Sequence, residues 1–297
     1  MATEVIDKAY IIDIIAACSN KQVQVVADLL EDLHPEDIAY IFYDISLEDA
    51  QFIIDAIEPE KAVQVVEALD DDILSRFFKG YESEDIAKRF ITLLDTDDAA
   101  DMINVLPTQR ANEVLSHIED KQFAGQIISL LHYPENSAGG LMAKELIKVK
   151  DSFTVTECIE AIREQAEEVQ KVYTVYVTDD YDKILGIISL KQIILSRADI
   201  KVGALMKNVE DLVKVNVYEE AEEVANLMYK YDLDAIPVVD ALGRLQGRIT
   251  IDDIVDFTKE EAERDYQLAS GLSENVESTD KVLVLSRARL PWLIVGL

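Results

Sequence analysis

Acidic side chains at helical spacing are the groups in this sequence best suited to chemistry. In the stretch 247–265, Asp253, Asp256 and Glu260 are spaced i, i+3 and i+7, so they share one face of an expected helix with Thr250 as its N-cap. This face has two interpretations: a solvated acidic surface, or half of a divalent-cation site that another part of the chain completes. Like charges on one helix face are mildly unfavourable unless a cation lies between them.

The overall charge favours a cationic partner over an anionic one. The 297 residues include 59 acidic and 28 basic side chains, which gives a formal net charge of -31. Such a charge argues against a nucleic-acid backbone or an anionic lipid surface as partner, and it is compatible with hard cations that prefer oxygen ligands. The hydrophobic fraction of 49% is sufficient for folded cores, and the length predicts two or three domains.

The cysteines and histidines indicate neither a disulfide framework nor a zinc site. Cys18 and Cys158 lie far apart in apolar segments, which predicts buried thiols in a reducing compartment. His34, His117 and His132 stand alone, without the spacing of a zinc motif. The sequence shows no nucleophile paired with a base, no phosphate-binding loop and no metal-hydrolase spacing, so it does not predict an enzyme.

The first half of the chain repeats a helix-start pattern about every twelve residues. Each start combines a capping residue or proline with acids in the first turn, and the starts fall at 34–37, 46–49, 58–61, 70–72, 82–85, 95–98, 106–108 and 119–120. The helices that follow are too short to be stable alone, so their neighbours must share a core. The pattern predicts an α-solenoid-like stack over about 20–131, preceded by a helix over 6–17.

The second half contains one β-α-β-β-α unit twice. We expect the first at 147–149, 155–165, 173–177, 185–188 and 190–196, and the second at 213–215, 220–231, 235–239 and 245–250 with a closing helix. The order predicts two small α/β units packed as a pseudo-symmetric pair. Between the halves, residues 133–142 contain a proline and two adjacent glycines, which predicts an irregular connection with available backbone carbonyls.

The last residues predict a membrane entry. Arg287 and Arg289 precede Pro291-Trp292 and an apolar run, which is the pattern of a cytoplasmic flank entering a membrane helix. The run is shorter than the roughly 20 residues that span a bilayer, so we expect the start of a truncated transmembrane helix. The alternative is a short apolar tail that packs on the domain. The first segment is charged, so no signal peptide is expected.

The second repeat resembles a CBS domain at 235–240 (AIPVVD), 243–247 (GRLQG) and 249–254 (ITIDDI), and the pair resembles a CBS tandem. With the helical stack, the linker YPENSAGGLM and the membrane entry, nearly all of the chain resembles the cytosolic region of an MgtE-type magnesium transporter. The resemblance implies an α + α/β fold. Its parts are a superhelical N domain at 1–132, a linker at 133–142, CBS domains at 143–204 and 205–265, a connecting "plug" helix region at 266–290, and the start of the first transmembrane helix at 291–297.

The resemblance also implies a function. The region would sense Mg²⁺ for a homodimeric membrane transporter or channel, with several weak Mg²⁺ sites between the acidic faces of the N and CBS domains. Bound Mg²⁺ would favour a compact, pore-closed state, and without it like charges would push the faces apart. By position in the family's motif, the metal-binding residues would be Asp97, Asp101, the Gly140 carbonyl, Glu220, Glu222, Asp232, Asp253, Asp256, Glu261 and Asp265. Arg264 departs from the family, which often carries an acid there.

Two other functions stay open at this point. Thr250 and Asp253 match the T-x-x-D pattern with which CBS pairs bind ribose and phosphate, so the region could sense adenine nucleotides, with ATP as a ligand. The first repeat has Ser189 and Gln192 at the corresponding positions, so at most one such site is expected. The helical repeat also resembles parts of the flagellar motor switch protein, which would suit a docking role. The expected partners are a second copy, the chain's own transmembrane domain and Mg²⁺, without nucleic acid, on the cytoplasmic side of the cell membrane.

Overall fold

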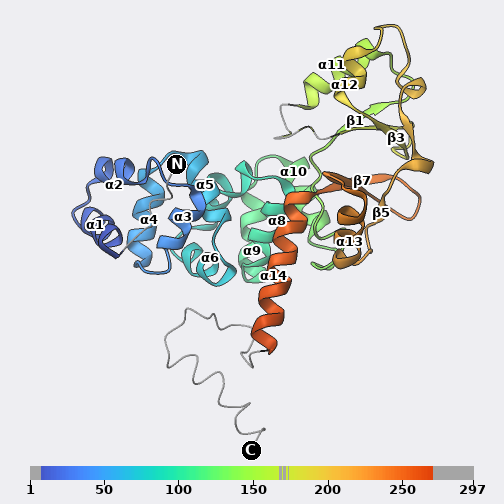
Figure 1. Ribbon diagram of the computed structural model, residues 1–297. Helices are drawn as coiled ribbons and strands as arrows, with labels where there is room; N and C mark the ends of the chain where they lie inside the picture. Colours follow the sequence, from blue (N-terminus) through green and yellow to red (C-terminus); the bar gives the residue numbers. More distant parts are fainter. Residues whose placement is uncertain (1–7, 167–168, 170–171, 173, 270–297) are drawn as a thin grey trace, which may run out of the picture. The chain divides into compact units, whose positions relative to one another are not determined.

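The computed structural model describes all residues except 1–7, 167–168, 170–171, 173 and 270–297 (Figure 1). The chain divides into two compact units, Met1–Leu131 and His132–Leu297. Where it is described, the N-terminal unit is helical, whereas the C-terminal unit contains two β-sheets with helices. Both free cysteines are buried, as their apolar surroundings predicted. No described helix is both long enough and apolar enough to cross a membrane.

The N-terminal unit is a succession of short helices that begin close to the predicted starts. Their bounds are α1 (Lys8–Ser19), α2 (Val23–Leu30), α3 (Pro35–Ile41), α4 (Leu47–Ala56), α5 (Pro59–Glu67), α6 (Asp71–Phe78), α7 (Ser83–Arg89), α8 (Thr96–Asn104), α9 (Thr108–His117) and α10 (Lys121–Leu130). The local reasons are visible at the ends. Pro35 and Pro59 occupy the first turns of α3 and α5, and the Ser46 hydroxyl accepts the Asp49 amide at 3.1 Å.

These helices share one core, which confirms the predicted stack. Phe42 after α3, Phe77 and Phe78 in α6 and Phe90 after α7 are buried, and the ring centroids of neighbouring pairs among them lie 5.7–6.0 Å apart. Lys61 adds a polar link, because its Nζ donates to the Leu30 carbonyl at 2.7 Å at the end of α2. Contacts between helices thus supply the stability that each short helix lacks by itself.

The C-terminal unit confirms the repeated β-α-β-β-α order. The first sheet runs β1-β2-β3-β4 and the second β5-β6-β7, with the first pair of each sheet parallel and the other pairs antiparallel. The bounds are β1 (Ile147–Lys150), α11 (Val155–Gln165), β2 (Val175–Thr178), β3 (Ile184–Ile188), α12 (Leu190–Leu195), β4 (Lys207–Asn208), β5 (Val215–Asn216), α13 (Ala221–Tyr231), β6 (Ala235–Val239), β7 (Leu245–Thr250) and α14 (Ile251–Ala269).

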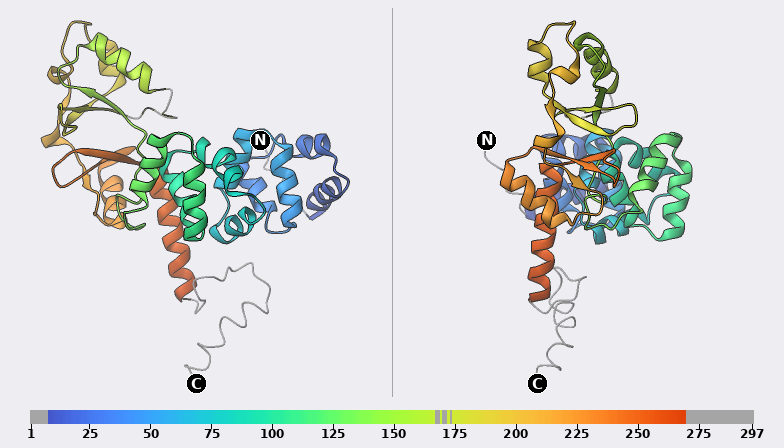
Figure 2. Two further views of the ribbon diagram at one scale, coloured as in Figure 1. Left: turned by 180° about the vertical axis from the view of Figure 1, so that it is seen from behind. Right: turned by 90° about the vertical axis from the view of Figure 1, so that its right-hand side faces the viewer.

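Several bounds differ from the expectation by one or two residues, as in α1 (Lys8–Ser19 against 6–17) and β2 (Val175–Thr178 against 173–177). Strand β4 was not predicted, because two residues are too few to show a period. The second repeat opens at Val215–Asn216 instead of 213–215. Helix α14 passes residue 265 without a break and extends beyond the sheet that precedes it (Figures 1 and 2). No glycine or proline interrupts 251–269, so nothing in the sequence ends the helix earlier. The predicted transmembrane start and the remainder of the connecting helix lie outside the described residues.

The two repeats are interlocked. The strand that leads into the second repeat, β4, pairs with β3 of the first, and Ala143, which leads into the first repeat, forms an antiparallel bridge with Arg248 in β7. A further bridge joins the two hairpin turns at Lys183 and Arg244. Between the sheets lies a small shared core of Tyr176, Ile184, Val239 and Leu245. The repeats therefore form one body within this unit.

Candidate cation and nucleotide sites

The connection that contains Gly140 is folded onto the second repeat. The Ala138 amide donates to the Glu219 carbonyl and the Gly139 amide to the Val217 carbonyl, both at 2.8 Å, and Ser137 forms an antiparallel bridge with Glu220. The expectation of freely available carbonyls was wrong at several positions, because those of Pro134, Asn136 and Ser137 each accept a backbone amide. The fold brings Gly140 and Glu220, two of the predicted metal-binding residues, to the same end of α13.

The start of α13 presents two of the predicted acids. Glu220 is its N-cap and Glu222 lies in its first turn, and both are exposed. Glu220 lines an open cavity of about 350 Å³ together with Asn216, Tyr218, Glu219 and Glu223. Acids at this end suit the helix dipole. The arrangement is therefore stable without a ligand and still offers several oxygen donors to one.

The end of α13 carries Asp232, far from Glu220. Asp232 takes the left-handed conformation with φ 52° and ψ 58° as the C-cap, and its side chain is exposed. The helix between the two acids rises about 1.5 Å per residue, so they lie about 18 Å apart along it. One Mg²⁺ with ligands at roughly 2.1 Å cannot bind both. Asp232 instead lies near the start of α14, because the Ile251 amide donates to the Asp234 carbonyl at 2.9 Å.

Helix α14 carries four more predicted residues in different settings. Asp253 is half-buried, and its Oδ2 accepts the Thr250 amide at 2.7 Å. Burial raises the pKa of Asp253, although its hydrogen bonds with Thr250 oppose the shift. Asp256 and Asp265 are exposed, whereas Glu261 forms an ion pair with Arg264. Arg264, which departs from the family pattern, thus competes with a metal ion for Glu261, one of the predicted ligands.

The two predicted acids of the N-terminal unit lie one turn apart on α8. Asp97 is 8% exposed and Asp101 is exposed. Neither residue is without an interaction partner. Asp97 lies in the first turn of its helix, where a carboxylate suits the helix dipole, so part of its role is local.

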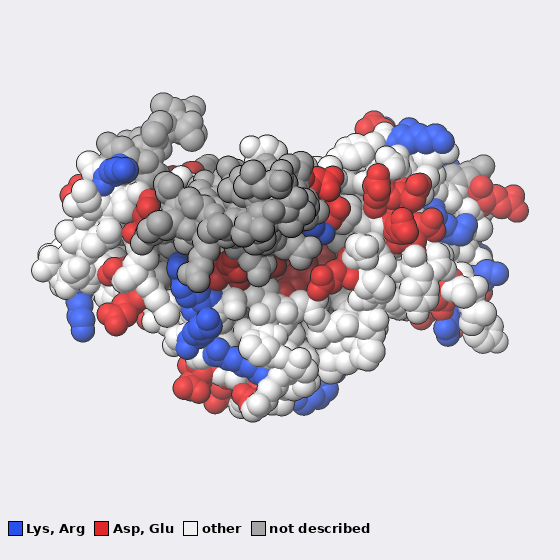
Figure 3. Space-filling model, turned by 90° about the horizontal axis from the view of Figure 1, so that it is seen from below, with Lys and Arg blue, Asp and Glu red and all other residues white. Residues whose placement is uncertain are grey.

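The carboxylate oxygens of these residues are suitable ligands for Mg²⁺. Acidic side chains gather in several groups on the face drawn in Figure 3. Among the described residues, however, no three His, Cys, Asp or Glu side chains are grouped so that they could hold a metal ion. Mg²⁺ keeps several of its waters and commonly uses one or two carboxylates. The residues therefore suit separate, water-rich contacts better than one closed cage.

The nucleotide pattern is present in the second repeat alone. Thr250 is 7% exposed and stands directly before α14, where its amide bonds Asp253. At the matching place in the first repeat the Ser189 hydroxyl accepts the Gln192 amide at 3.2 Å, and the Gln192 side chain donates to the Leu205 carbonyl. Both pairs cap the helix that follows, and only the second pair retains a carboxylate.

Sequence reasoning did not single out a buried polar contact between the repeats. Arg248 is 5% exposed and its Nε donates to the Glu145 carbonyl at 2.6 Å, while Lys144 donates to the Gln246 carbonyl at 2.9 Å. Burial lowers the pKa of Lys144 to about 8. A basic residue inside a strand pattern was the available signal for Arg248. The sequence did not indicate that Arg248 would bond the Glu145 carbonyl, which lies 103 residues earlier in the chain.

Comparisons with known proteins agree with this architecture. The family model of the MgtE intracellular N domain matches residues 33–136, and that of the CBS domain matches 138–199 and 202–260. The magnesium transporter MgtE of Enterococcus faecalis is 34% identical over 171 residues, which are 58% of this chain and 37% of that protein. MgtE of Thermus thermophilus is 33% identical over 183 residues, which are 61% of this chain and 40% of that protein. The chain therefore spans well under half the length of these relatives.

A solved structure extends the likeness to the fold. The crystal structure of the cytosolic domain of the Mg²⁺ channel MgtE in complex with ATP superposes with a TM-score of 0.75 at 26% identity and covers 83% of this chain and 99% of that one. A helical N domain followed by a CBS pair defines a class of multidomain regions that combine these two family modules. Within that class, the chain belongs to the family of MgtE-type magnesium transporters, of which it contains the intracellular N domain and the CBS pair.

Proposed function

We propose that this region senses Mg²⁺ and gates the transport activity of a membrane protein to which it belongs. Mg²⁺ ions between acidic residues of the N domain and of the CBS pair favour the compact arrangement that closes the pore. The N domain contributes Asp97 and Asp101. The CBS side contributes Gly140, Glu220, Glu222, Asp232, Asp253, Asp256, Glu261 and Asp265. The full protein is a homodimer in the cell membrane with this region in the cytoplasm, and the region itself catalyses no reaction.

The observation that carries the proposal is the charge of both units. Residues 1–131 contain 28 acidic and 9 basic side chains, and residues 132–297 contain 31 and 19. Two bodies of the same sign repel at short range, and at an effective dielectric constant of ~20 a pair of unit charges 4 Å apart costs about 4 kcal/mol. A hard cation that binds only when both bodies are close reverses the balance and shifts the population toward the compact state.

Small-angle scattering tests this proposal directly. The radius of gyration of the purified region is measured in chelator, in ~10 mM MgCl₂, a concentration chosen to saturate weak sites, and in NaCl of equal ionic strength. We expect compaction with MgCl₂ and not with NaCl. Equal compaction in both salts would show general screening, and unchanged dimensions in MgCl₂ would refute the proposal.

A matched pair of variants sharpens the result. Glu222→Gln with Asp256→Asn removes two exposed acids from the proposed face. Glu160→Gln with Asp180→Asn removes two exposed acids from the first repeat. The first variant should raise the Mg²⁺ concentration at half-compaction by about tenfold, which corresponds to 1.4 kcal/mol. The second, which changes the net charge equally, should leave that concentration unchanged.

A second function, ATP binding, has its own support. The solved relative holds ATP, and Thr250 and Asp253 in this chain form the T-x-x-D pair at the start of α14. Calorimetry with ATP and AMP, on the wild type and on Asp253→Ala, tests it. We expect one site per chain, since the first repeat has Gln192 in place of the acid. If the heat of nucleotide binding is the same for Asp253→Ala as for the wild type, the nucleotide does not bind at Asp253.

A further inference from the structure

The connection between the domains is an added edge of the second repeat. Three backbone hydrogen bonds join residues 136–139 to residues 217–221. The Ala138 amide donates to Glu219, the Gly139 amide to Val217, and the Ala221 amide returns a bond to Asn136 at 3.0 Å. Ala138 is fully buried, and Ser137 is 4% exposed. This segment is therefore part of the folded body and not a loose tether.

Aromatic packing closes the contact from outside. The rings of Tyr133 and Tyr218 meet edge to face, with centroids 5.8 Å apart and planes at 63°. A Cβ atom at Gly139 would lie 2.5 Å from Cγ of the Tyr133 ring and 2.8 Å from the Val217 carbonyl. Only glycine allows this approach without displacing the ring or the backbone. Tyr218 itself is 71% exposed, so the fold of the repeat does not depend on burying it.

The first repeat holds its corresponding segment with the same backbone pattern. The Val202 amide donates to the Phe153 carbonyl at 2.8 Å, and the Gly203 amide donates to the Asp151 carbonyl at 3.0 Å. These backbone bonds are therefore a shared part of both repeats. Among the described residues, the Tyr133–Tyr218 ring contact that covers them has no counterpart in the first repeat, so it is the part of the contact that the shared fold does not require.

We infer that Tyr133, Gly139 and Tyr218 are positioning residues that fix Gly140 and the start of α13 in one rigid geometry for cation binding. The inference rests on the proposed function. Backbone hydrogen bonds to the linker involve Glu219 and Ala221, the residues on both sides of Glu220, so the linker fixes the backbone from which that side chain projects. A preformed set of donors avoids the ordering cost that a loose linker would impose each time a cation binds.

The test is a set of tyrosine variants with two readouts. Tyr218→Ala removes the ring, Tyr218→Phe keeps it, and Tyr181→Ala removes a tyrosine that is 82% exposed in the first hairpin turn. Amide hydrogen exchange at Ala138 and Gly139 reports the linker contact. Scattering reports the Mg²⁺ concentration at half-compaction. Tyr218→Ala should speed exchange at both amides and raise that concentration about tenfold, and the other two variants should change neither.

The outcomes separate this inference from the proposed function. Faster exchange with an unchanged Mg²⁺ midpoint would show that the contact is structural only, and would overturn the inference while the sensing function stands. A wild-type protein that ignores Mg²⁺ would overturn both. Gly139→Ala is the second variant, because it expels the Tyr133 ring. If neither Tyr218→Ala nor Gly139→Ala changes exchange at Ala138, these residues do not hold the linker and the inference is wrong.

Discussion

The two CBS repeats share one plan, and the shared parts are those that the backbone requires. In each hairpin an aspartate, Asp179 or Asp240, accepts the amides two and four residues later, at 2.8–3.0 Å. Each turn then has a residue of positive φ, Asp182 at 59° and Gly243 at 78°. The turns also bond each other, because the Leu245 amide donates to the Asp182 carbonyl at 2.9 Å. Turn geometry is thus common to both repeats.

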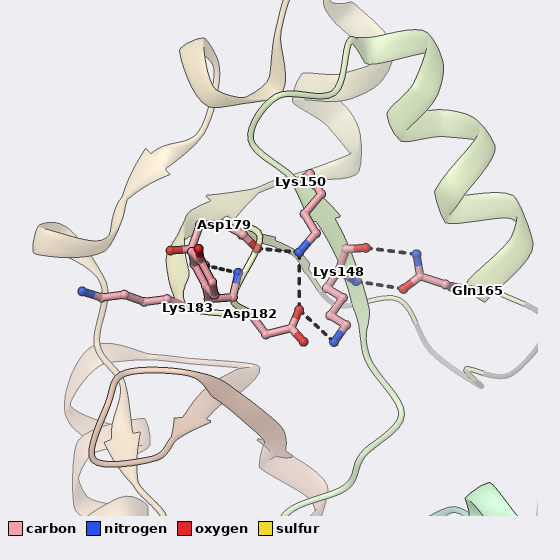
Figure 4. Close-up of polar contacts among 7 residues, drawn as sticks. Lys148, Lys150, Gln165, Asp179, Asp182 and Lys183 are labelled. Carbon is pink, nitrogen blue, oxygen red and sulfur yellow. Dashed lines mark hydrogen bonds and ion pairs between the residues drawn. The ribbon is translucent and has the colours of Figure 1, made fainter.

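The repeats differ in surface charge. Residues 143–204 contain 11 acidic and 9 basic side chains, whereas 205–265 contain 16 and 7. In the first repeat Lys148 and Lys150 balance Asp182, with Nζ to Oδ1 distances of 3.1 and 3.6 Å (Figure 4). The two repeats thus share their backbone contacts, whereas the second repeat is more acidic and carries the Tyr133–Tyr218 ring contact. Four predictions test this division, beginning with the largest effect.

The central glycines of β3 and β7 should be the least replaceable shared feature. A Cβ atom at Gly186 would lie 2.1 Å from the Lys207 carbonyl, and one at Gly247 would lie 2.5 Å from the Ala143 carbonyl. Alanine at either place should lower the free energy of unfolding by about 3 kcal/mol, because the strand that crosses from the other repeat must move. Urea denaturation measures this loss. Gly125 in α10 has open space around it, so Gly125→Ala should be neutral or stabilising.

Arg248 marks an internal difference between the repeats. Its counterpart in β3 is Ile187, so Arg248→Met makes the second repeat resemble the first. The change leaves the Glu145 carbonyl without its charged donor, and we expect a loss of about 2–3 kcal/mol. Arg244→Met is the control, because that side chain is half exposed and its ion pair with Asp240 contributes less than about 1 kcal/mol. Equal losses in both variants would contradict a special role for burial.

In the second hairpin turn, alanine at Gly243 should be tolerated less well than aspartate. Gly243 has φ 78°, where a Cβ atom strains the backbone, so Gly243→Ala should cost about 1 kcal/mol. Gly243→Asp should cost less, because aspartate already occupies the corresponding left-handed position at residue 182. Thermal unfolding of the three proteins compares them. An aspartate variant less stable than the alanine variant would show that the turns are not equivalent.

The smallest of the four effects concerns the caps at the start of α12 and α14. The cap of α14 should make the free energy of unfolding depend on pH, and the cap of α12 should not. Burial raises the pKa of Asp253 above its unfolded value, so protonation stabilises the fold below the unfolded pKa, and this stabilisation is lost as the pH rises through the folded pKa. Asp253→Asn resembles Gln192 and removes the dependence. In chelator, the wild type should gain stability relative to Asp253→Asn as the pH falls from 7 toward the ordinary aspartate pKa of about 3.9. Urea denaturation at several pH values measures the difference.

The sequence alone determined the periodic parts of this protein. Capping residues and prolines marked the starts of α3 to α10, because those signals act on the neighbouring turn. The strands β6 and β7 and the helix α11 matched their expected bounds, since each combines a clear period with turn residues on both sides. The acidic character of the second repeat and the pairing of Thr250 with Asp253 were also readable, because both lie within a few residues along the chain.

Only the tertiary structure decided which distant segments meet. The exchange of β4 and Ala143 between the repeats, the Arg248 contact to Glu145 and the fastening of Ser137 to Glu220 join residues that are 20 to 105 positions apart. Each depends on two backbones being brought into register by the packing of whole sheets, and no local pattern encodes that register. The predicted cation ligands were therefore named from the sequence, and the fold divided them between the start of α13, its end and the length of α14.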